Sequence, residues 1–358
     1  TQVSRTELAR RSSLTKPTVS AIVEELITEG IVHEVGFSKS EPTGGRRARL
    51  IEFDPESAAY VGIRLGVGSM TVAVADGLGR IRLQKEGQSA KGTPAAAVAH
   101  ADALLSEVLA ELGIPRARVQ ALGVAVGGLV ETETGRVVLS PNLGWEDVPL
   151  RDLLTDRFGV PSHVANVTDA AAIAEARSGA AKGVRDFVWI YVGTGIGSGI
   201  YTGGHLFRGR SGFAGEIGFC RMAADGPILE ELASGRAILE RARQQIGPDV
   251  QHTYEVLERA SRGERDALLV TEEAGAALGL AVAHLVNIIT PVLVVLGGGV
   301  IVASPVYVEA VRRAVLEQVL GPERVPVVTT ELAGGAITAG AVFLAMDQAV
   351  QSFRIVAT

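Results

Sequence analysis

Apolar residues near the start of the chain recur at helical spacing and predict two helices. Ser4-Arg5-Thr6-Glu7 has the pattern of a capping box, with Ser4 as the N-cap and Glu7 reaching back to it, and predicts a short first helix. Thr15 is a good N-cap for a second helix, which tolerates Pro17 in its first turn. The apolar positions of this second helix form one stripe: Val19, Ile22, Val23, Leu26 and Ile27.

A hairpin is predicted to follow the second helix. Gly30 suits the position just after a helix end, where a left-handed backbone is common. Ile31–Val35 and Arg49–Phe53 are apolar enough for two strands, and the polar loop Gly36–Arg47 joins them. A helix, a short turn, a capped helix and a hairpin with a basic loop are typical of a winged helix-turn-helix, which we expect over residues 1–54.

The exposed positions of this unit suit contact with duplex DNA. The first turn of the second helix carries Lys16, Thr18 and Ser20, whose donors can reach base edges or phosphates in a major groove. Arg46 and Arg47 lie in the glycine-rich loop, where their guanidinium groups can contact phosphates or a minor groove. The alternative is a helical interaction module whose charged side chains are only solvated.

The rest of the chain contains two similar sets of strands. Tyr60–Leu65 and Met70–Ala75 flank a glycine-rich turn, and Phe187–Val192 and Ile200-Tyr201 flank another. Two α/β lobes, each beginning with a strand, a glycine turn and a strand, would place a cleft between them. Such turns can direct backbone N–H groups at a phosphate, although a single one is most often only a turn. Further predicted elements are the helices Ala95–Leu112, Ala170–Arg177 and Ala274–Ile289 and the strands Ala121–Val126 and Val292–Leu296.

Length and composition narrow the class of protein. A chain of 358 residues exceeds what one core organises, so two or three domains are expected. Cys220 is the single cysteine, which excludes an intrachain disulfide and a cysteine-based zinc site. The net charge of −6 argues against a chain coated in nucleic acid.

The most apolar stretch, Leu285–Val302, is interrupted by Asn287, Pro291 and glycines, so we expect a buried helix and strand there. With no secretory pattern at the start, a cytoplasmic location without membrane contact is expected.

Four segments of the chain occur together in one known family. They are Ser140-Pro141-Asn142-Leu143-Gly144-Trp145, Gly193-Thr194-Gly195-Ile196-Gly197, Gly215-Glu216-Ile217-Gly218, and Leu229-Glu230 followed by Ala233-Ser234-Gly235. Together with Ser4–Ala9 and Thr43–Arg47, they make the chain similar over nearly its whole length to the ROK family of bacterial sugar kinases and repressors. The likeness is to its repressors of the xylose and N-acetylglucosamine type.

The resemblance implies an α/β fold in which the winged helix-turn-helix precedes an actin-like (ribonuclease H-like) two-lobed domain. One lobe is expected over residues 57–168 and the other over residues 169–358. The last helix of the chain is expected to pack back on the first of these lobes.

Departures from the family pattern imply that phosphoryl transfer is lost. Family kinases carry an aspartate in the first strand before the glycine turn, where this chain has Arg64. Their catalytic base is the aspartate of an Asn-Asp pair, but here Asn166 is followed by Val167, which cannot take a proton. Asp169 lies two residues further on, and in a helix that displacement turns the side chain away by roughly 200°. The resemblance therefore implies a protein that is no enzyme and uses no cofactor.

The family's zinc site also lacks its ligands in this sequence. Phe219 replaces the histidine that follows Glu-Ile-Gly, and the downstream cysteine cluster is absent. No metal is therefore expected, and the loop Phe219–Pro227 is expected to be held by packing.

The resemblance implies that sugar recognition is the part of the family's function that this sequence retains. Asn142, Asn166, Glu216 and Glu230 match family positions that hydrogen-bond sugar hydroxyls, a task that suits amides and carboxylates. The resemblance implies a regulator, most often a repressor of carbohydrate-metabolism genes, that binds a duplex DNA operator and responds to a monosaccharide or a sugar derivative. A homodimer or a dimer of dimers is expected.

Three alternatives remain open at this point. The four polar residues can be an inherited scaffold in a cleft that binds nothing. The regulator can be controlled by a docking partner protein instead of a sugar. An active sugar kinase with a DNA-binding appendage is the third, against which the missing base argues.

Overall fold

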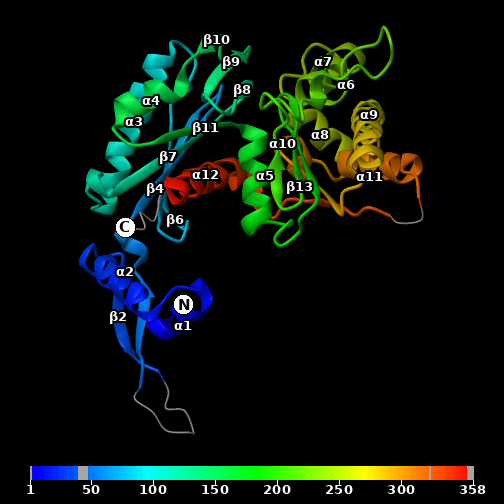
Figure 1. Cartoon of the computed structure of the whole chain (residues 1–358). Coiled ribbons are helices and arrows are strands. Elements are labelled where there is room, and N and C mark those ends of the chain that lie inside the picture. The colour runs from blue at the N-terminus through cyan, green and yellow to red at the C-terminus, as the bar shows by residue number, and fades with distance from the viewer. Residues whose placement is uncertain (1, 39–46, 322–323, 353–358) are drawn as a thin grey trace.

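The computed structural model describes residues 2–38, 47–321 and 324–352 and contains both helices and strands. Figure 1 shows a small unit at the N-terminus and two larger lobes, each built on a five-stranded sheet. The predicted mixed α/β class is confirmed. Arg46 and most of the predicted basic loop lie outside the described residues.

Both predicted N-terminal helices are present. Helix α1 (Arg5–Ser12) has Ser4 as its N-cap, whose hydroxyl accepts from the N–H of Glu7 at 3.2 Å. The predicted return contact from Glu7 is wrong. Its carboxylate pairs with Arg10 and Arg11 instead, and these guanidinium groups lower the pKa of Glu7 to about 2.

Helix α2 (Lys16–Thr28) begins after Thr15, whose hydroxyl accepts from the N–H of Thr18 at 3.4 Å. Gly30 follows with a φ of 73°, the left-handed conformation expected after a helix end. A three-stranded antiparallel sheet completes the unit, in the order β1 (Val3–Ser4), β3 (Arg49–Phe53) and β2 (Val32–Phe37). The helices and the sheet share one small apolar cluster: Ala9, Val19, Val23 and Ile51.

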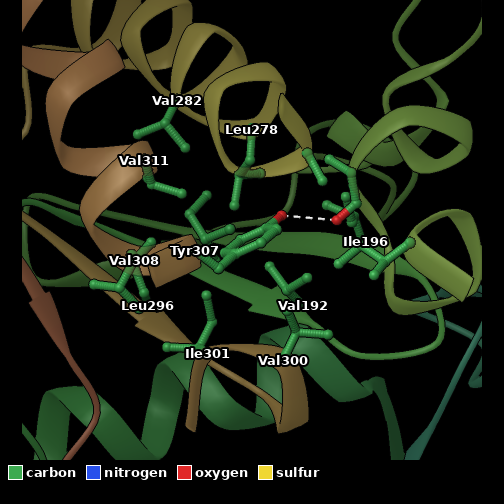
Figure 2. Packing of buried hydrophobic residues seen from close by; sticks show 14 of the residues in the cluster. Val192, Ile196, Leu278, Val282, Leu296, Val300, Ile301, Tyr307, Val308 and Val311 are labelled. Atoms are coloured by element: carbon green, nitrogen blue, oxygen red, sulfur yellow. Dashed lines mark hydrogen bonds between the residues drawn. The ribbon is translucent and has the colours of Figure 1, made fainter. Parts of the chain in front are cut away.

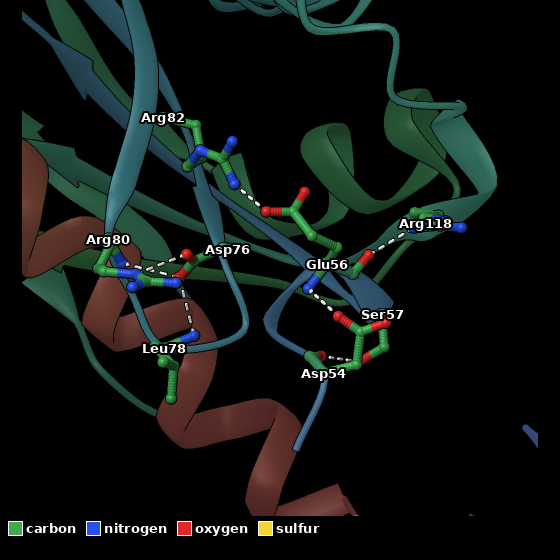
Figure 3. A network of polar contacts seen from close by, with 8 residues as sticks. All are labelled: Asp54, Glu56, Ser57, Asp76, Leu78, Arg80, Arg82 and Arg118. Atoms are coloured by element: carbon green, nitrogen blue, oxygen red, sulfur yellow. Dashed lines mark hydrogen bonds and ion pairs between the residues drawn. The ribbon is translucent and has the colours of Figure 1, made fainter. Parts of the chain in front are cut away.

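The segment after this unit is bonded to both of its neighbours. The N–H of Asp54 donates to the carbonyl of Ile31 at 2.9 Å, which holds the segment to the N-terminal unit. On the other side, Glu56 pairs through its carboxylate with Arg82, and its carbonyl accepts from Arg118 at 2.5 Å (Figure 3). The N-terminal unit is therefore attached to the first lobe by directed contacts and does not hang on a free linker.

The first lobe is built on the sheet β11-β7-β4-β5-β6. Strands β4, β5 and β6 pair antiparallel, and β7 and β11 add in parallel on the other side of β4. The elements of this lobe are β4 (Ala59–Leu65), β5 (Met70–Asp76), β6 (Ile81–Gly87), α3 (Pro94–Leu112), β7 (Val119–Val126), α4 (Leu150–Phe158) and β11 (Ser162–Asn166), with a small sheet of β8 (Leu129–Glu131), β9 (Arg136–Ser140) and β10 (Trp145–Val148).

The second lobe repeats this strand order. Its sheet runs β14-β13-β12-β15-β16, with antiparallel pairs on one side of β12 and parallel pairs on the other. The two predicted sets of strands are therefore parts of two sheets that share one arrangement of antiparallel and parallel pairs. The elements of this lobe are α5 (Val167–Ser178), β12 (Phe187–Val192), β13 (Ile196–Thr202), β14 (His205–Phe207), α6 (Leu229–Ala233), α7 (Gly235–Gln245), α8 (Thr253–Ser261), α9 (Arg265–Ile289), β15 (Leu293–Gly297), α10 (Gly299–Ala303), α11 (Pro305–Gln318) and β16 (Val327–Thr329).

Two helices lie between the sheets. Helix α12 (Ala336–Ser352) packs on β4 and β7, helix α5 packs on β12 and β13, and the two helices contact each other (Figure 1). Glycines allow the close approach, because a Cβ at Gly123 would overlap the carbonyl of Ala341, and one at Gly340 would overlap the carbonyl of Ala170. Helix α12 therefore connects the two lobes, since it packs on the sheet of the first lobe and on α5 of the second.

The core of the second lobe surrounds Tyr307. Its ring is fully buried between helix α9 and the sheet, and its hydroxyl donates to the carbonyl of Ala233 at 2.7 Å (Figure 2). Among the described residues, α9 is the one helix long and apolar enough to cross a membrane, and 56% of its apolar window is buried inside the protein. The predicted helix and strand within Leu285–Val302 are confirmed, since α9 ends at Ile289 and β15 begins at Leu293.

Candidate functional site

A cavity of about 490 Å³ lies between the two lobes. Both glycine turns line it, residues 66–68 from the first lobe and residues 194–197 from the second. Its other walls come from the loop around Asn142, the start of α5, the turn at Glu216 and the start of α6. A second hollow, at the end of α11, has no carboxylate or amide side chain among the described residues of its wall. The cavity between the lobes is therefore the candidate ligand site.

Asn166 is held firmly where β11 meets α5. As the N-cap of α5, its Oδ1 accepts from both the N–H and the hydroxyl of Thr168 at 2.7 Å. Its Nδ2 donates to the carbonyl of Gly128 at 2.8 Å and to Glu216 Oε1 at 3.3 Å. A ligand hydroxyl at Asn166 would share or replace one of these bonds, so the amide is a rigid and already oriented partner.

Glu230 connects the second glycine turn to helix α7. Its Oε2 accepts from the N–H of Ile196 at 2.9 Å, and its Oε1 accepts from Arg236 Nη2 at 3.0 Å. A Cβ at position 195 would overlap this carboxylate and force it to move. Each oxygen retains a lone pair for a ligand hydroxyl, and both are fixed in place. The sequence did not reveal Arg236, whose one signal is its position directly after Ala233-Ser234-Gly235.

Glu216 is half-buried and faces the amide of Asn166 across the cavity wall. Burial raises the pKa of Glu216 to about 7, and the charge of Glu230 adds to the rise. Near neutral pH this carboxyl group can therefore accept from a hydroxyl or, when protonated, donate to one.

Asn142 is exposed on its loop and makes no hydrogen bond to a described residue. The structure thus brings all four predicted sugar-binding residues to one cavity.

The position of the kinase base is apolar. Val167 lines the cavity, whereas Asp169 does not. Asp169 is only 5% exposed, and burial raises its pKa to about 7. The residue that follows Asn166 in the cavity wall is therefore apolar, and the carboxyl group of Asp169 is buried outside that wall.

Arg64 stands at the other end of the cavity, beside the first glycine turn. Its Nη2 donates to the hydroxyls of Ser69 at 3.1 Å and Thr71 at 3.2 Å, and lies 3.8 Å from the carboxylate of Glu86. Tyr191, which the sequence did not single out, faces the same end from strand β12. Burial raises the pKa of Tyr191, and the charge of Arg64 partly offsets that rise.

The loop Phe219–Pro227, expected to be held by packing, has Met222 packed against the core of the second lobe and is also closed by backbone hydrogen bonds. Leu229 N donates to the carbonyl of Cys220 at 2.9 Å, and Met222 N donates to that of Pro227 at 3.3 Å. Phe219 is 57% exposed and lines the cavity. Within the described residues, no group of three or more His, Cys, Asp or Glu side chains is arranged to hold a metal ion.

Of the five residues expected to contact DNA, four are described. Lys16 and Thr18 are exposed on the first turn of α2, and the Thr18 hydroxyl hydrogen-bonds that of Thr15 at 2.8 Å. Ser20 is half-buried, so its surface is smaller than expected. Arg47 is exposed at the base of the loop.

Two solved structures show which class of protein has this fold. The crystal structure of a ROK family transcriptional regulator, a homologue of the E. coli MLC protein, matches 97% of this chain and 92% of that one, with a TM-score of 0.82 and 25% identity. A ROK family glucokinase from Streptomyces griseus, solved with glucose and AMPPNP, matches 81% of this chain and 100% of that one, with a TM-score of 0.73 and 28% identity. Regulators and sugar kinases thus share this two-lobed, actin-like fold.

The family follows from the sequence comparisons. The ROK family model matches residues 60–348. A protein named "Xylose repressor" from Caldicellulosiruptor bescii is 30% identical over 335 residues, which cover 87% of this chain and 83% of the relative. The chain belongs to the ROK family.

Proposed function

We propose that this protein is a sugar-responsive, DNA-binding transcription regulator that represses carbohydrate-metabolism genes in the cytoplasm. The observation that carries the proposal is the cavity between the lobes, where Asn142, Asn166, Glu216 and Glu230 converge while Val167 occupies the place of a catalytic base. The relative named as a xylose repressor and the neighbour described as a transcriptional regulator support the same function. The ligand is a monosaccharide or a derivative of one.

The DNA-binding part of the proposal rests on the N-terminal unit. Two helices followed by a hairpin have the order of a winged helix-turn-helix over residues 1–54, with α2 as the recognition helix. Lys16 and Thr18 project from its first turn and would contact base edges, whereas Arg46 and Arg47 would contact phosphates. The lobes over residues 57–168 and 169–358 would form the sugar-binding part.

Sugar binding would reach the DNA through the contacts around Asp54 and Glu56 (Figure 3). A sugar that prefers one arrangement of the lobes shifts the protein toward that arrangement. Because the N-terminal unit is attached to the first lobe, rotation of that lobe moves α2. In a homodimer the two recognition helices must lie about 34 Å apart to enter successive major grooves, so a small rotation weakens operator binding.

Replacing Arg46 and Arg47 together with alanine is expected to weaken binding to every DNA sequence. Two lost phosphate contacts should reduce the slope of log affinity against log salt by about 2. The measurement is fluorescence anisotropy of the full chain on labelled duplexes at several salt concentrations. An unchanged slope would remove the loop from the proposed interface.

Lys16→Ala and Thr18→Ala are the matched contrast, because they change the helix that would read bases. Each is expected to lower affinity for the preferred duplex more than for an unrelated one, by about tenfold in the ratio. Equal losses on both duplexes would assign these residues to the phosphates instead.

We further propose that the protein is no sugar kinase. Purified protein with ATP, Mg²⁺ and a panel of monosaccharides is expected to give no sugar-dependent ADP release in a coupled assay, because Val167 cannot take the hydroxyl proton. Val167→Asp alone is expected to remain inactive, because Arg64 still occupies the first-strand position of the kinase aspartate. Sugar-dependent ADP release by the unaltered protein would contradict this.

A further inference from the structure

The turn between β5 and β6 (residues 77–80) lies against both the N-terminal unit and α12. A Cβ at Gly77 would be 2.6 Å from the nearest ring atom of Phe53, the last residue of β3. A Cβ at Gly79 would be 2.8 Å from the nearest ring atom of Phe343 on α12. The β5–β6 turn is therefore packed between the hairpin of the proposed DNA-binding unit and the helix that connects the two lobes.

Hydrogen bonds keep the β5–β6 turn in one shape. The carboxylate of Asp76 is buried and accepts from the N–H of Leu78 at 2.9 Å and from the N–H and Nε of Arg80 at 3.1 and 2.8 Å (Figure 3). The N–H of Gly77 donates to the carbonyl of Pro55 at 2.8 Å, in the segment that joins the N-terminal unit to the first lobe. Because closely packed groups transmit displacements, movement of α12 against this turn would shift β3.

Arg177 of the second lobe contacts α12 beside the same turn. Its guanidinium group forms an ion pair with Asp347 and lies over the ring of Phe343, 5.1 Å from the ring centre. The ring of Phe343 thus has Arg177 of the second lobe as one neighbour and the β5–β6 turn of the first lobe as another. The side chains of Arg177 and Asp347 are 37% and 39% exposed, so their ion pair contributes little to the stability of the fold. These contacts can therefore change as the lobes move without loss of the fold.

Helix α5 connects the cavity to Arg177. Residues 166–168 at the start of the helix line the cavity, and Arg177 lies in its last turn. Between these ends α5 crosses α12 in backbone contact, at Ala170 and Gly340. Arg177 is seven residues beyond the crossing, about 10 Å along the helix. A rotation of α5 about the crossing displaces its ends most, so it would change the contacts of Arg177 with α12.

We propose that Arg177 couples the cavity to the N-terminal unit by passing rotation of α5 through Phe343 and Asp347 to the β5–β6 turn. This inference rests on the proposed control of DNA binding by a sugar, and it identifies the path of that control. A ligand that favours one arrangement of the lobes sets the angle at which α5 crosses α12. Arg177 then holds α12, and with it the turn and Phe53, in the position that belongs to that arrangement. Arg177 is a positioning residue, because it does not line the cavity and acts through Phe343 and the turn.

The test measures sugar binding, DNA binding and their coupling in the full chain. Calorimetry with xylose, glucose, N-acetylglucosamine and the 6-phosphates of the last two identifies the ligand that binds most tightly. Anisotropy then gives the affinity for a duplex selected from a random-sequence pool, with and without saturating amounts of that ligand. In the unaltered protein the ligand is expected to weaken DNA binding at least about tenfold. In Arg177→Gln the weakening is expected to be about threefold or less, a reduction that one exposed ion pair and one cation–π contact allow.

Arg177→Gln is expected to keep its affinity for the sugar and, without sugar, its affinity for DNA within about twofold, which a merely structural defect would not do. Arg177→Lys, which keeps the ion pair, should retain part of the coupling, whereas Phe343→Leu, which removes the ring, should lose it. Arg116→Gln is the matched control. Arg116 also lies over an aromatic ring, that of Phe158 at 5.5 Å, and pairs with Asp102, but all three residues belong to the first lobe.

Full coupling in Arg177→Gln would overturn the inference and leave the proposed function standing. An equal loss of coupling in Arg116→Gln would also overturn it. So would a change of more than about fivefold in the affinity of Arg177→Gln for the sugar alone or for DNA alone, since the residue would then act on binding itself. If no tested sugar binds the unaltered protein, or if the bound sugar leaves its DNA affinity unchanged, the proposed function fails and the inference fails with it.

Discussion

Gly340→Ala is expected to destabilise the protein by about 3 kcal/mol, the opposite of the usual effect of this substitution in a helix. A Cβ at position 340 would overlap the carbonyl of Ala170, because α12 and α5 cross in direct backbone contact. The clash is with backbone, so no flexible side chain can move aside to relieve it. The helices must separate, and with them the two lobes.

The measurement is the urea unfolding midpoint, followed by tryptophan fluorescence. Trp145 reports on the first lobe and Trp189 on the second, and both are buried. Gly334→Ala, in the turn that precedes α12, is the control, since a Cβ there meets nothing within 4 Å. Equal midpoints for the two variants would show that the helix crossing is looser than described.

Glu230→Ala is expected to weaken sugar binding by about a hundredfold. The substitution removes a ligand partner and also leaves Arg236 and the N–H of Ile196 without their acceptor. A buried site that hydrogen-bonds a hydroxyl loses heavily when one partner is removed. The affinity is measured by titration calorimetry with the monosaccharides and sugar phosphates that bind the unaltered protein.

DNA binding by Glu230→Ala is expected to be unchanged, because Glu230 is remote from the N-terminal unit. In a reporter strain, the variant should act as a repressor that its sugar no longer releases. Glu240→Ala, exposed on α7 of the same lobe, is the control. Equal affinity of Glu230→Ala and the unaltered protein for a sugar would place the site elsewhere.

Much of the fold could be predicted because its helices and hairpins depend on residues that are close together in the sequence. The apolar stripe from Val19 to Ile27 predicted α2, and the glycine turns between apolar runs predicted the hairpins β4–β5 and β12–β13. Element ends were less accurate: the predicted helix Ala274–Ile289 begins in the structure at Arg265, since the buried length depends on what packs against it. The two-residue strand β1 is too short to leave any pattern.

The parts that could not be predicted depend on contacts between distant segments. One local prediction also failed: Glu7 fits a capping box, but its carboxylate pairs with Arg10 and Arg11, three and four residues further along the same helix. The bond from Asn166 to Glu216 and the approach of Tyr191 to Arg64 depend on packing between distant segments, whereas the pair Glu230–Arg236 depends on how α6 meets α7 within the second lobe. No spacing along the chain encodes them.

A sugar bound between the lobes is expected to change the affinity of the protein for DNA. The direct test uses a duplex selected from a random-sequence pool by the full chain, with its affinity measured by anisotropy at fixed salt. Saturating ligand, taken from the sugars and sugar phosphates that bind in calorimetry, is expected to weaken binding of this duplex by at least about tenfold in the unaltered protein. The same ligand should have no effect on Glu230→Ala. An affinity for the duplex that no sugar or sugar phosphate changes would contradict control of DNA binding by a sugar and would favour control by a docking protein.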